Sequence, residues 1–222
     1  MERNICFNEQ IFVESGIPMN SLTYRITKRI FDIAVSAIAL ILLSPAMLLI
    51  CLLIKLDSKG PVFFVHKRHG KNGKPLYLIK FRTMCVNAQE MIASFTPEQR
   101  AEWEANFKLV DDPRITRMGK ILRKTSLDEL PQLINILRGD MSIVGPRPVI
   151  TDELEKYGIY QDKFLSVSPG LTGYWQAYAR SDCSYEKRME MELHYIKNAN
   201  FWWDLKIIFA TFWTVIKGKG AR

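Results

Sequence analysis

The amino-acid sequence predicts a mostly helical α/β protein with a small sheet, built as a single domain that is attached to a membrane. The chain has 222 residues, of which 48% are hydrophobic and 24% are charged. This length suits one folded domain, and this composition excludes intrinsic disorder. Two further observations complete the prediction: residues 33–54 carry no charge, and two short apolar strands precede several helical patterns.

The uncharged run at 33–54 predicts a membrane helix. As a helix its 22 residues would extend about 33 Å, slightly more than the ~30 Å hydrocarbon core of a bilayer. It begins too late in the chain for a signal peptide, and no small-residue cleavage site follows it. Ser44 and Pro45 lie at its centre. Because proline removes a backbone donor, we expect a sharp kink there, with the Ser44 hydroxyl placed to satisfy a freed carbonyl.

Both flanks of this run are basic. Arg25, Lys28 and Arg29 precede it, and residues 55–82 contain eight Lys and Arg residues against one acid. The positive-inside rule draws both ends to the cytoplasm. A helix–break–helix that enters and leaves by the same membrane face satisfies the break and the charges together. An ordinary kinked transmembrane helix is an alternative, and a buried core helix is a third.

The chain after this run alternates short strands and helices. Residues 61–65 and 76–81 are expected to be strands, joined by a turn rich in Gly and Lys. Two prolines stiffen residues 142–150, which are expected to be extended. Apolar residues at helical spacing predict helices at 87–108 (with a restart at Thr96-Pro97), 118–122, 130–137 and 185–196.

The C-terminal tail, 201–217, carries three of the five tryptophans and few charges. It is short for a membrane span. Aromatic rings between basic ends favour a helix that lies in the headgroup plane of the membrane. A buried terminal helix is the alternative.

The cysteines and the net charge indicate which kinds of structural site and binding partner to expect. The four cysteines form no CxxC or Cys/His cluster, so neither a structural zinc site nor a disulfide framework is expected. The net charge of +8 implies anionic partners. Nucleic acid is not expected among them, because the basic residues cluster at the membrane flanks and around acidic residues. A non-catalytic adaptor that binds anionic lipid stays an alternative.

The chemistry is expected between Asp112 and Arg147, where seven Lys and Arg residues surround four acids. Asp128 and Glu129 follow Ser126 in the pattern S-x-x-E. A purely structural interpretation is a capping box, with Ser126 as the N-cap and Glu129 as its partner. A functional interpretation is compatible with it. A carboxylate at a helix start stays ionised in the helix dipole, and an ionised Asp128 can attack a phosphorus atom to form an acyl phosphate.

A pyrophosphate substrate would need cations beside this carboxylate. Arg123 and Arg147 can supply bidentate, charge-assisted hydrogen bonds. Arg147 lies between two prolines, which would present its guanidinium on a stiff arm. A divalent cation, Mg²⁺, is expected between the carboxylate and the phosphate oxygens.

The chain closely resembles the bacterial sugar transferases, the monotopic phosphoglycosyl transferases that act on polyprenyl phosphate. The motifs that carry the resemblance run in order from about Lys28 to Ala221: KRIFD, the SP of the apolar run, GPVFF, KFRTM, DPRITRMGKILRKTSLDELPQLINILRGDMSIVGPRP and PGLTGYWQ. The absence of a large membrane region before Lys28 makes it similar to the small members, which consist of the catalytic core.

The resemblance implies a fold and a reaction. The fold is one catalytic domain with a re-entrant helix broken at Ser44-Pro45, on the cytoplasmic face of the bacterial inner membrane. The reaction moves a sugar-1-phosphate from a UDP-sugar to undecaprenyl phosphate and releases UMP, as the first membrane step of capsule or exopolysaccharide assembly. Asp128 is the implied nucleophile of a covalent intermediate. Glu129 is implied to assist as an acid/base or a positioning group, and both carboxylates are implied to bind the Mg²⁺. Direct transfer, with Asp128 as a metal ligand only, is the alternative that the residues leave open.

The resemblance also implies the phosphate-binding residues. Arg123 and Arg147 map to such positions, and Lys80 and Arg82 of KFRTM are expected to line the same pocket. Arg180 is retained in a loop that departs from the family pattern at 177–180, so the sugar stays open, although the part after Pro169 is more similar to the hexose-transferring branch.

We therefore expect four segments. These are an N-terminal extension of open role (1–24), the re-entrant helix (25–59), the catalytic domain on the cytosolic face (60–200) and the interfacial aromatic helix (201–222). The expected partners are the UDP-sugar, undecaprenyl phosphate and membrane phospholipids. A homodimer contact through the tail or residues 1–24 is a further expectation.

Overall fold

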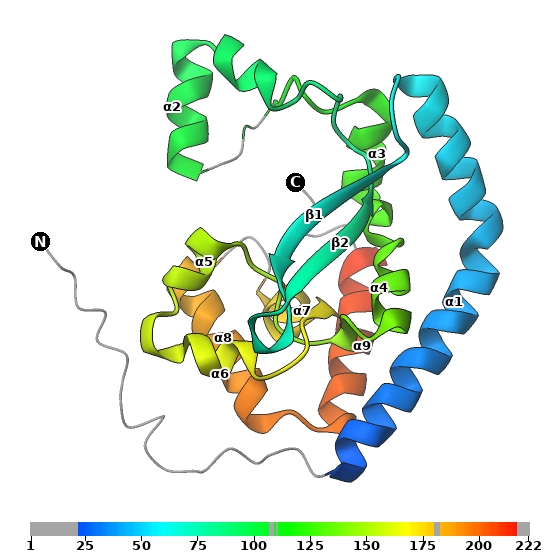
Figure 1. Ribbon diagram of the computed structural model, residues 1–222, viewed down its shortest axis with the longest axis vertical. Coiled ribbons are helices and arrows are strands. Elements are labelled where there is room, and N and C mark those ends of the chain that lie inside the picture. The colour runs from blue at the N-terminus through cyan, green and yellow to red at the C-terminus, as the bar shows by residue number, and fades with distance from the viewer. Residues whose placement is uncertain (1–21, 107–108, 110, 180–182, 217–222) are drawn as a thin grey trace, which may run out of the picture.

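The computed structural model describes residues 22–106, 109, 111–179 and 183–216, and the chain is mostly helical with two small sheets (Figure 1). This confirms the mostly helical fold with a small sheet content that the sequence predicts. Its helices are α1 (Leu22–Asp57), α2 (Pro97–Asn106), α3 (Arg117–Thr125), α4 (Gln132–Arg138), α5 (Thr151–Glu155), α6 (Gln161–Leu165), α7 (Tyr174–Tyr178), α8 (Tyr185–Asn198) and α9 (Phe201–Ile216). Its strands are β1 (Phe63–His69), β2 (Pro75–Phe81), β3 (Ser142–Val144) and β4 (Gly170–Thr172).

Helix α1 is continuous through Pro45, so the expected helix–break–helix is a bent helix instead (Figure 1). Proline 45 has no N–H to donate to the carbonyl of Ile41, four residues earlier. The Ser44 hydroxyl donates to that carbonyl at 2.8 Å, which confirms its expected role. Because the freed carbonyl is satisfied inside the helix, the chain bends at the proline without losing its helical path.

Both ends of α1 pack on the same folded body. Near its start, Arg29 donates two hydrogen bonds to the last carbonyls of α4, at Ile136 and Leu137. Near its end, Ile50 and Ile54 are buried, and they belong to a second apolar cluster with Phe81 of β2 and Leu122 of α3. The middle of α1 is largely exposed and apolar. Among the described residues, α1 is the helix that is long and apolar enough to cross a membrane, judged by length and composition.

Strands β1 and β2 form the expected antiparallel hairpin, closed by the turn at 71–73. The predicted helix at 87–108 is in two pieces. A 3₁₀ segment occupies 90–94, and α2 starts at Pro97, where the restart was expected, with the Thr96 hydroxyl accepting a hydrogen bond from the Gln99 N–H. Residues 107 and 108 lie outside the described part.

The expected capping box at Ser126 is wrong. Ser126 has a φ of 59° and ends α3 in the left-handed conformation, and its side chain makes no capping bond. Residues 127–129 then form a single 3₁₀ turn before Pro131 and α4. The connection from α3 to α4 is therefore a sharp corner, and Asp128 and Glu129 lie on it.

The expected extended segment at 142–150 contributes β3, which pairs in parallel with β4. The pairing needs glycine, because a Cβ on Gly170 would lie 2.1 Å from the backbone nitrogen of Gly145. The backbone also pairs just past the strand end, where Gly145 N donates to Thr172 O and Gly170 N donates to Pro146 O. The two segments GPRP and TGYWQ therefore leave the sheet side by side.

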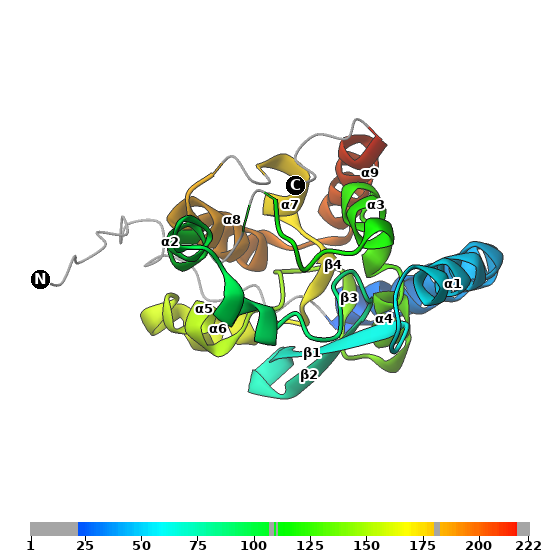
Figure 2. The same ribbon diagram turned by 90° about the horizontal axis from the view of Figure 1, so that it is seen from above.

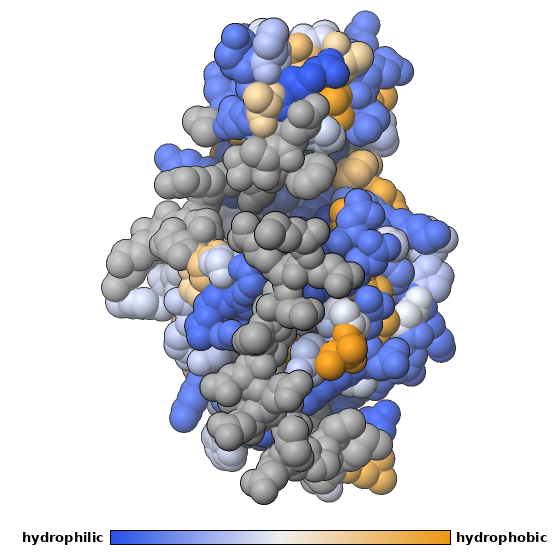
Figure 3. Space-filling view, turned by 90° about the vertical axis from the view of Figure 1, so that its left-hand side faces the viewer, coloured by the Kyte–Doolittle hydropathy of each residue, from blue (hydrophilic) through white to orange (hydrophobic). Residues whose placement is uncertain are grey.

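Helices α8 and α9 close the molecule on the side of β3 and β4. The main core cluster joins β2, α4, β3, α8 and α9, and its fully buried members include Ile136, Leu193 and Ile207. Seen from above, α9, α3 and α1 lie on the same side of the body (Figure 2), and the start of α1 contacts α9 through Lys28 and Asp204. The face opposite α1 is largely hydrophilic (Figure 3). Helix α9 buries Asp204 and Ile207 but exposes Trp202, Phe209, Phe212 and Trp213, so it is not the buried terminal helix of the alternative.

The cysteines agree with the expected absence of a disulfide framework as far as the structure describes them. Cys51, Cys85 and Cys183 are free thiols, and Cys6 lies outside the described residues.

Candidate active site

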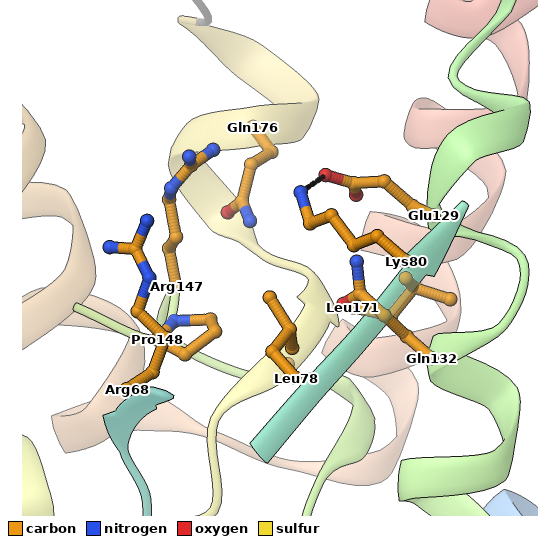
Figure 4. Close-up of a pocket in the computed structure, with 10 residues that line it drawn as sticks. Arg68, Leu78, Lys80, Glu129, Gln132, Arg147, Pro148, Leu171 and Gln176 are labelled. Atoms are coloured by element: carbon orange, nitrogen blue, oxygen red, sulfur yellow. Dashed lines mark hydrogen bonds and ion pairs between the residues drawn. The ribbon is translucent and has the colours of Figure 1, made fainter. Parts of the chain in front are cut away.

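A pocket lined by three basic side chains and one acidic side chain opens between the hairpin and the β3–β4 pair (Figure 4). On one side stand Lys80 of β2 and Glu129 of the corner after α3, and on the other stand Arg68 of β1 and Arg147 of GPRP. Three strand segments and one helix corner therefore converge on it. The polar side chains that line the pocket are Arg68, Lys80, Glu129, Gln132, Arg147 and Gln176.

The shortest contact in the pocket joins Lys80 and Glu129. Lys80 Nζ lies 2.6 Å from Glu129 Oε1, and both side chains are partly exposed. Burial would raise the pKa of Glu129, but the nearby ammonium of Lys80 and the more distant Arg147 outweigh it, so the pKa lies below its usual value. Glu129 is therefore an anion at neutral pH. The Glu129 carboxylate can therefore bind a cation, but it carries no proton to donate.

Asp128, the expected nucleophile, is half-buried beside Glu129. Burial and the Glu129 carboxylate raise its pKa to about 6, while the charges of Lys80 and Arg123 act in the opposite direction. The helix dipole therefore does not hold this carboxylate at an ordinary pKa, because a three-residue 3₁₀ turn has almost none. At pH 7 the group is still mostly ionised, and its poor solvation favours attack on an electrophile.

The other expected cations divide into two groups. Arg147 and Lys80 line the pocket, as expected. Arg123 lies behind Asp128: its Nε donates to Thr83 Oγ1 at 3.0 Å, and its charge lowers the pKa of Asp128. Arg82 does not line the pocket. Its guanidinium is buried and donates to the carbonyls of Ser58 and Lys59, so it fastens the chain where it leaves α1.

Arg180 lies outside the described residues, and its expected role stays a prediction. Three polar residues of the pocket were not predicted: Arg68, Gln132 and Gln176. Arg68 was counted with the basic flank of the membrane run, and only the pairing of β1 with β2 turns it toward the pocket. Gln176 ends the motif PGLTGYWQ, which was a signal that could have identified it.

Arg68 and Arg147 are connected through a chain of buried charges. Glu153 accepts a hydrogen bond from Arg68 at 2.8 Å and one from Arg188 at 3.4 Å. Arg188 in turn lies 3.7 Å from Glu192, which accepts the backbone N–H of Arg147 at 3.0 Å. On the side of the pocket formed by Arg68 and Arg147, three arginines and two glutamates thus alternate in one chain of contacts.

The family model described as bacterial sugar transferase matches residues 23–218. The chain belongs to the bacterial sugar transferase family. The exopolysaccharide production protein ExoY of Sinorhizobium fredii is 46% identical over 88% of both chains. The undecaprenyl-phosphate galactose phosphotransferase of Salmonella typhimurium is 46% identical over 89% of this chain and 42% of its own length.

A third member of the family is the UDP-glucose:undecaprenyl-phosphate glucose-1-phosphate transferase of Escherichia coli, 38% identical over 89% of this chain and 42% of its own length. The chain therefore spans less than half the length of several curated relatives and almost the full length of others. The matched region contains every described residue of the pocket, so the site of this sugar transferase lies within the shared part.

The donors suit a hard cation held jointly with a substrate. No group of three or more His, Cys, Asp and Glu side chains capable of holding a metal occurs in the part of the chain that the structure describes. Asp128 and Glu129 provide two adjacent carboxylates. Magnesium in proteins commonly takes one or two carboxylates and completes its shell with phosphate oxygens and water. The site therefore fits Mg²⁺ that arrives with a diphosphate.

Proposed function

We propose that this protein transfers a sugar-1-phosphate from a UDP-sugar to undecaprenyl phosphate and releases UMP. The observation that carries the proposal is a half-buried carboxylate, Asp128, that directly precedes Glu129 of the pocket wall and is electrostatically coupled to Lys80, one of three basic side chains lining that pocket. The three basic side chains that line the pocket, Arg68, Lys80 and Arg147, support a phosphate-bearing substrate. The names of three relatives specify galactose, glucose and N-acetylgalactosamine as the transferred sugars, with undecaprenyl phosphate as the acceptor.

The reaction is proposed to run in two steps. An oxygen of the Asp128 carboxylate attacks the β-phosphorus of the UDP-sugar, the bond from that phosphorus to the UMP oxygen breaks, and an acyl phosphate carries the sugar. A phosphate oxygen of undecaprenyl phosphate then attacks the same phosphorus, and the Asp128 oxygen leaves as a carboxylate. Atoms and charge balance without a redox partner, and the enzyme returns to its starting form.

The neighbouring side chains have separable roles in this scheme. Lys80 and Arg147 face each other across the pocket and would hold the diphosphate, which loses its hydration on entry. Arg123 favours the anionic form of Asp128 from behind. Glu129 is ionised and paired with Lys80, which supports a positioning role more than proton donation. When bound, Mg²⁺ held by Asp128 and Glu129 would supply charge neutralisation at the phosphates.

The membrane arrangement is proposed to be re-entrant. Arg29 and Asp32 at the start of α1 bond to α4 and β3, while Ile54 at its end packs on β2 and α3. Since both ends contact one body, that body cannot lie on two sides of a membrane. The exposed apolar middle of α1 would enter the bilayer and return by the same face. This places Asp128 where a soluble nucleotide sugar and a lipid phosphate can both reach it.

Helix α9 is proposed to lie at the same membrane surface. Its polar contacts through Asp204 hold it to α1, and its exposed side is aromatic. Tryptophan and phenylalanine at a headgroup boundary suit an interfacial helix. The protein would then sit on the cytoplasmic face of the bacterial inner membrane through two elements that lie close together.

The reaction is tested by intact-protein mass spectrometry. Purified protein in nanodiscs is mixed with Mg²⁺ and a panel of UDP-hexoses and UDP-N-acetylhexosamines, with the lipid acceptor left out. We expect a sugar-phosphate adduct with at least one donor, and none in Asp128→Asn. If undecaprenyl phosphate is converted but no adduct ever forms, the two-step scheme fails and direct transfer with Asp128 as a metal ligand takes its place. If no donor is converted at all, the proposed transferase activity is rejected.

A further inference from the structure

The strands around GPRP stop pairing just before Arg147. Gly145 N donates to Thr172 O, and Gly170 N donates back to Pro146 O, which completes the ladder between the two segments. Proline 146 and Pro148 have no N–H. Arg147 therefore carries the first free backbone donor beyond the sheet, in a segment that is otherwise buried. A buried N–H of this kind needs an acceptor from elsewhere.

That acceptor is a carboxylate from a distant helix. Glu192 of α8 is 1% exposed, and its Oε1 accepts the Arg147 N–H at 3.0 Å. Its other oxygen, Oε2, accepts the hydroxyl of Tyr157. Both oxygens are thus used, and neither contacts the Arg147 guanidinium by any hydrogen bond or ion pair of the described residues.

The charge of Glu192 is balanced by a different arginine. Arg188, one turn earlier on α8, lies 3.7 Å from Glu192 Oε1. Its guanidinium is buried between the rings of Trp175 and Tyr185, at 4.8 and 5.1 Å from their centroids. Because Arg188 neutralises Glu192, the positive charge of Arg147 stays available for an anion.

The guanidinium of Arg147 itself makes no hydrogen bond to any described residue, although it lines the pocket. Its position therefore depends on its backbone. The two prolines restrict that backbone, and the Glu192 carboxylate anchors it.

We propose that Glu192 is a positioning residue for the transferase, which fixes the backbone of Arg147 so that its guanidinium meets the donor diphosphate. This inference rests on the proposed function, in which Arg147 binds that diphosphate. Loss of the anchor would leave the Arg147 N–H buried without an acceptor. The GPRP segment would then shift to find one, and the guanidinium would move with it.

The test is a double-mutant cycle on ligand binding, so it does not need turnover. Binding of inorganic pyrophosphate and of UDP is measured by calorimetry for the wild type, Glu192→Leu, Arg147→Ala and the double variant. We expect Glu192→Leu, which removes the acceptor, to weaken binding of both ligands roughly five- to tenfold, and the double variant to bind within about twofold of Arg147→Ala. Glu192→Gln keeps an amide oxygen that can accept the Arg147 N–H, so it should bind both ligands within about twofold of the wild type. Glu190→Leu is the matched control, since Glu190 is an exposed acid on the same helix.

Two results would overturn the inference. One is wild-type affinity in Glu192→Leu, and the other is additivity, in which the double variant shows the product of the two single losses. Tyr157→Phe provides a milder second variant, because it removes one bond to Glu192 and leaves the Arg147 contact in place. We expect it to weaken binding less than Glu192→Leu and to lower the melting temperature less. Turnover of UDP-sugars is measured in a separate assay. A negative turnover assay would reject the proposed function, whereas the binding cycle alone decides whether Glu192 positions Arg147.

Discussion

Lys28 at the start of α1 and Asp204 of α9 form an ion pair with an Nζ–Oδ2 distance of 2.6 Å across 176 residues of sequence. The same carboxylate accepts the hydroxyls of Tyr24 and Tyr195, at 2.8 and 2.7 Å. Asp204 is 3% exposed, so its charge is almost fully desolvated and its three donors replace water. One buried carboxylate therefore joins the two elements that we place at the membrane and connects both to α8.

This junction should dominate the stability of the membrane-facing side. Asp204→Ala leaves the Lys28 ammonium and two hydroxyls without their acceptor. Breaking a buried pair costs about 3–5 kcal/mol, and the lower end applies because the Lys28 side chain is 18% exposed. A loss of about 3 kcal/mol lowers the melting temperature by roughly 6–12 °C in a chain of this size. Thermal unfolding in one detergent measures it. Lys206→Ala, an exposed change on the same helix, should stay within about 2 °C of the wild type.

The raised pKa of Asp128 predicts an acid limb in the rate of adduct formation. The attacking group is the carboxylate, so the rate should fall as pH drops through about 6, following the ionised fraction. Stopped-flow or quenched assays of the first step, between pH 5 and 8, would show it. A limb near pH 4, the ordinary range of an aspartate, would contradict the environment described for this residue.

The same pKa predicts a gain in stability when the charge is removed. The folded pKa lies above the unfolded value of 3.8, so the ionised group opposes folding above about pH 6, and this cost vanishes below the unfolded pKa. Asp128→Asn should therefore be inactive yet more stable at pH 7.5, by about 1–3 kcal/mol after allowance for partial exposure. Melting curves at pH 7.5 and pH 4.5 test the sign. The advantage over the wild type should shrink at the lower pH, and an unchanged advantage would point to packing rather than charge.

The Lys80 side chain should determine the pH at which the rate of adduct formation begins to fall. Its ammonium pairs with Glu129 and lowers the pKa of Asp128. In Lys80→Met the pKa of Asp128 should rise, which would move the acid limb upward by about one pH unit or more. Activity lost at pH 7 should return in part at pH 8. Lys120→Met is the control, because Lys120 is an exposed lysine paired with Asp111 away from the pocket. A uniform loss at every pH would mean that Lys80 acts only by binding phosphate.

The sequence predicted the parts of this site better than their arrangement. The apolar run, the hairpin and the helices at 130–137, 185–196 and 201–217 follow from hydrophobic periodicity, which is local information. The bend at Pro45 and its repair by Ser44 were also predictable, because the lost donor and the hydroxyl are adjacent. The corner at Ser126 was not, since a capping box and a left-handed helix end share the same residues there.

Long-range contacts account for the remaining errors. The motif KFRTM predicts Arg82 as a pocket cation, but its guanidinium donates hydrogen bonds to two carbonyls just after α1. The sequence predicts Arg68 as one of the cations that flank the membrane run, but the pairing of β1 with β2 places it in the pocket wall. Glu192 lies in an ordinary helical pattern, and nothing local distinguishes it from exposed Glu190 two residues earlier. The order of charged residues along the sequence does not show which of them come into contact in the folded protein.

The close approach of GPRP to TGYWQ gives the last prediction. A Cβ on Gly170 would lie 2.1 Å from Gly145 N, so Gly170→Ala must separate β3 from β4 or distort both. We expect a loss of at least about 3 kcal/mol, together with loss of pyrophosphate binding, because Arg147 and Gln176 are carried on the two segments that this pairing aligns. Gly158→Ala is the matched control. Gly158 has a φ of 49° and open space around its Cα, so its cost should be about 1 kcal/mol and binding should survive. Urea unfolding and calorimetry on both variants measure the two effects. Retained pyrophosphate affinity in a folded Gly170→Ala protein would show that the phosphate site does not depend on the parallel pair.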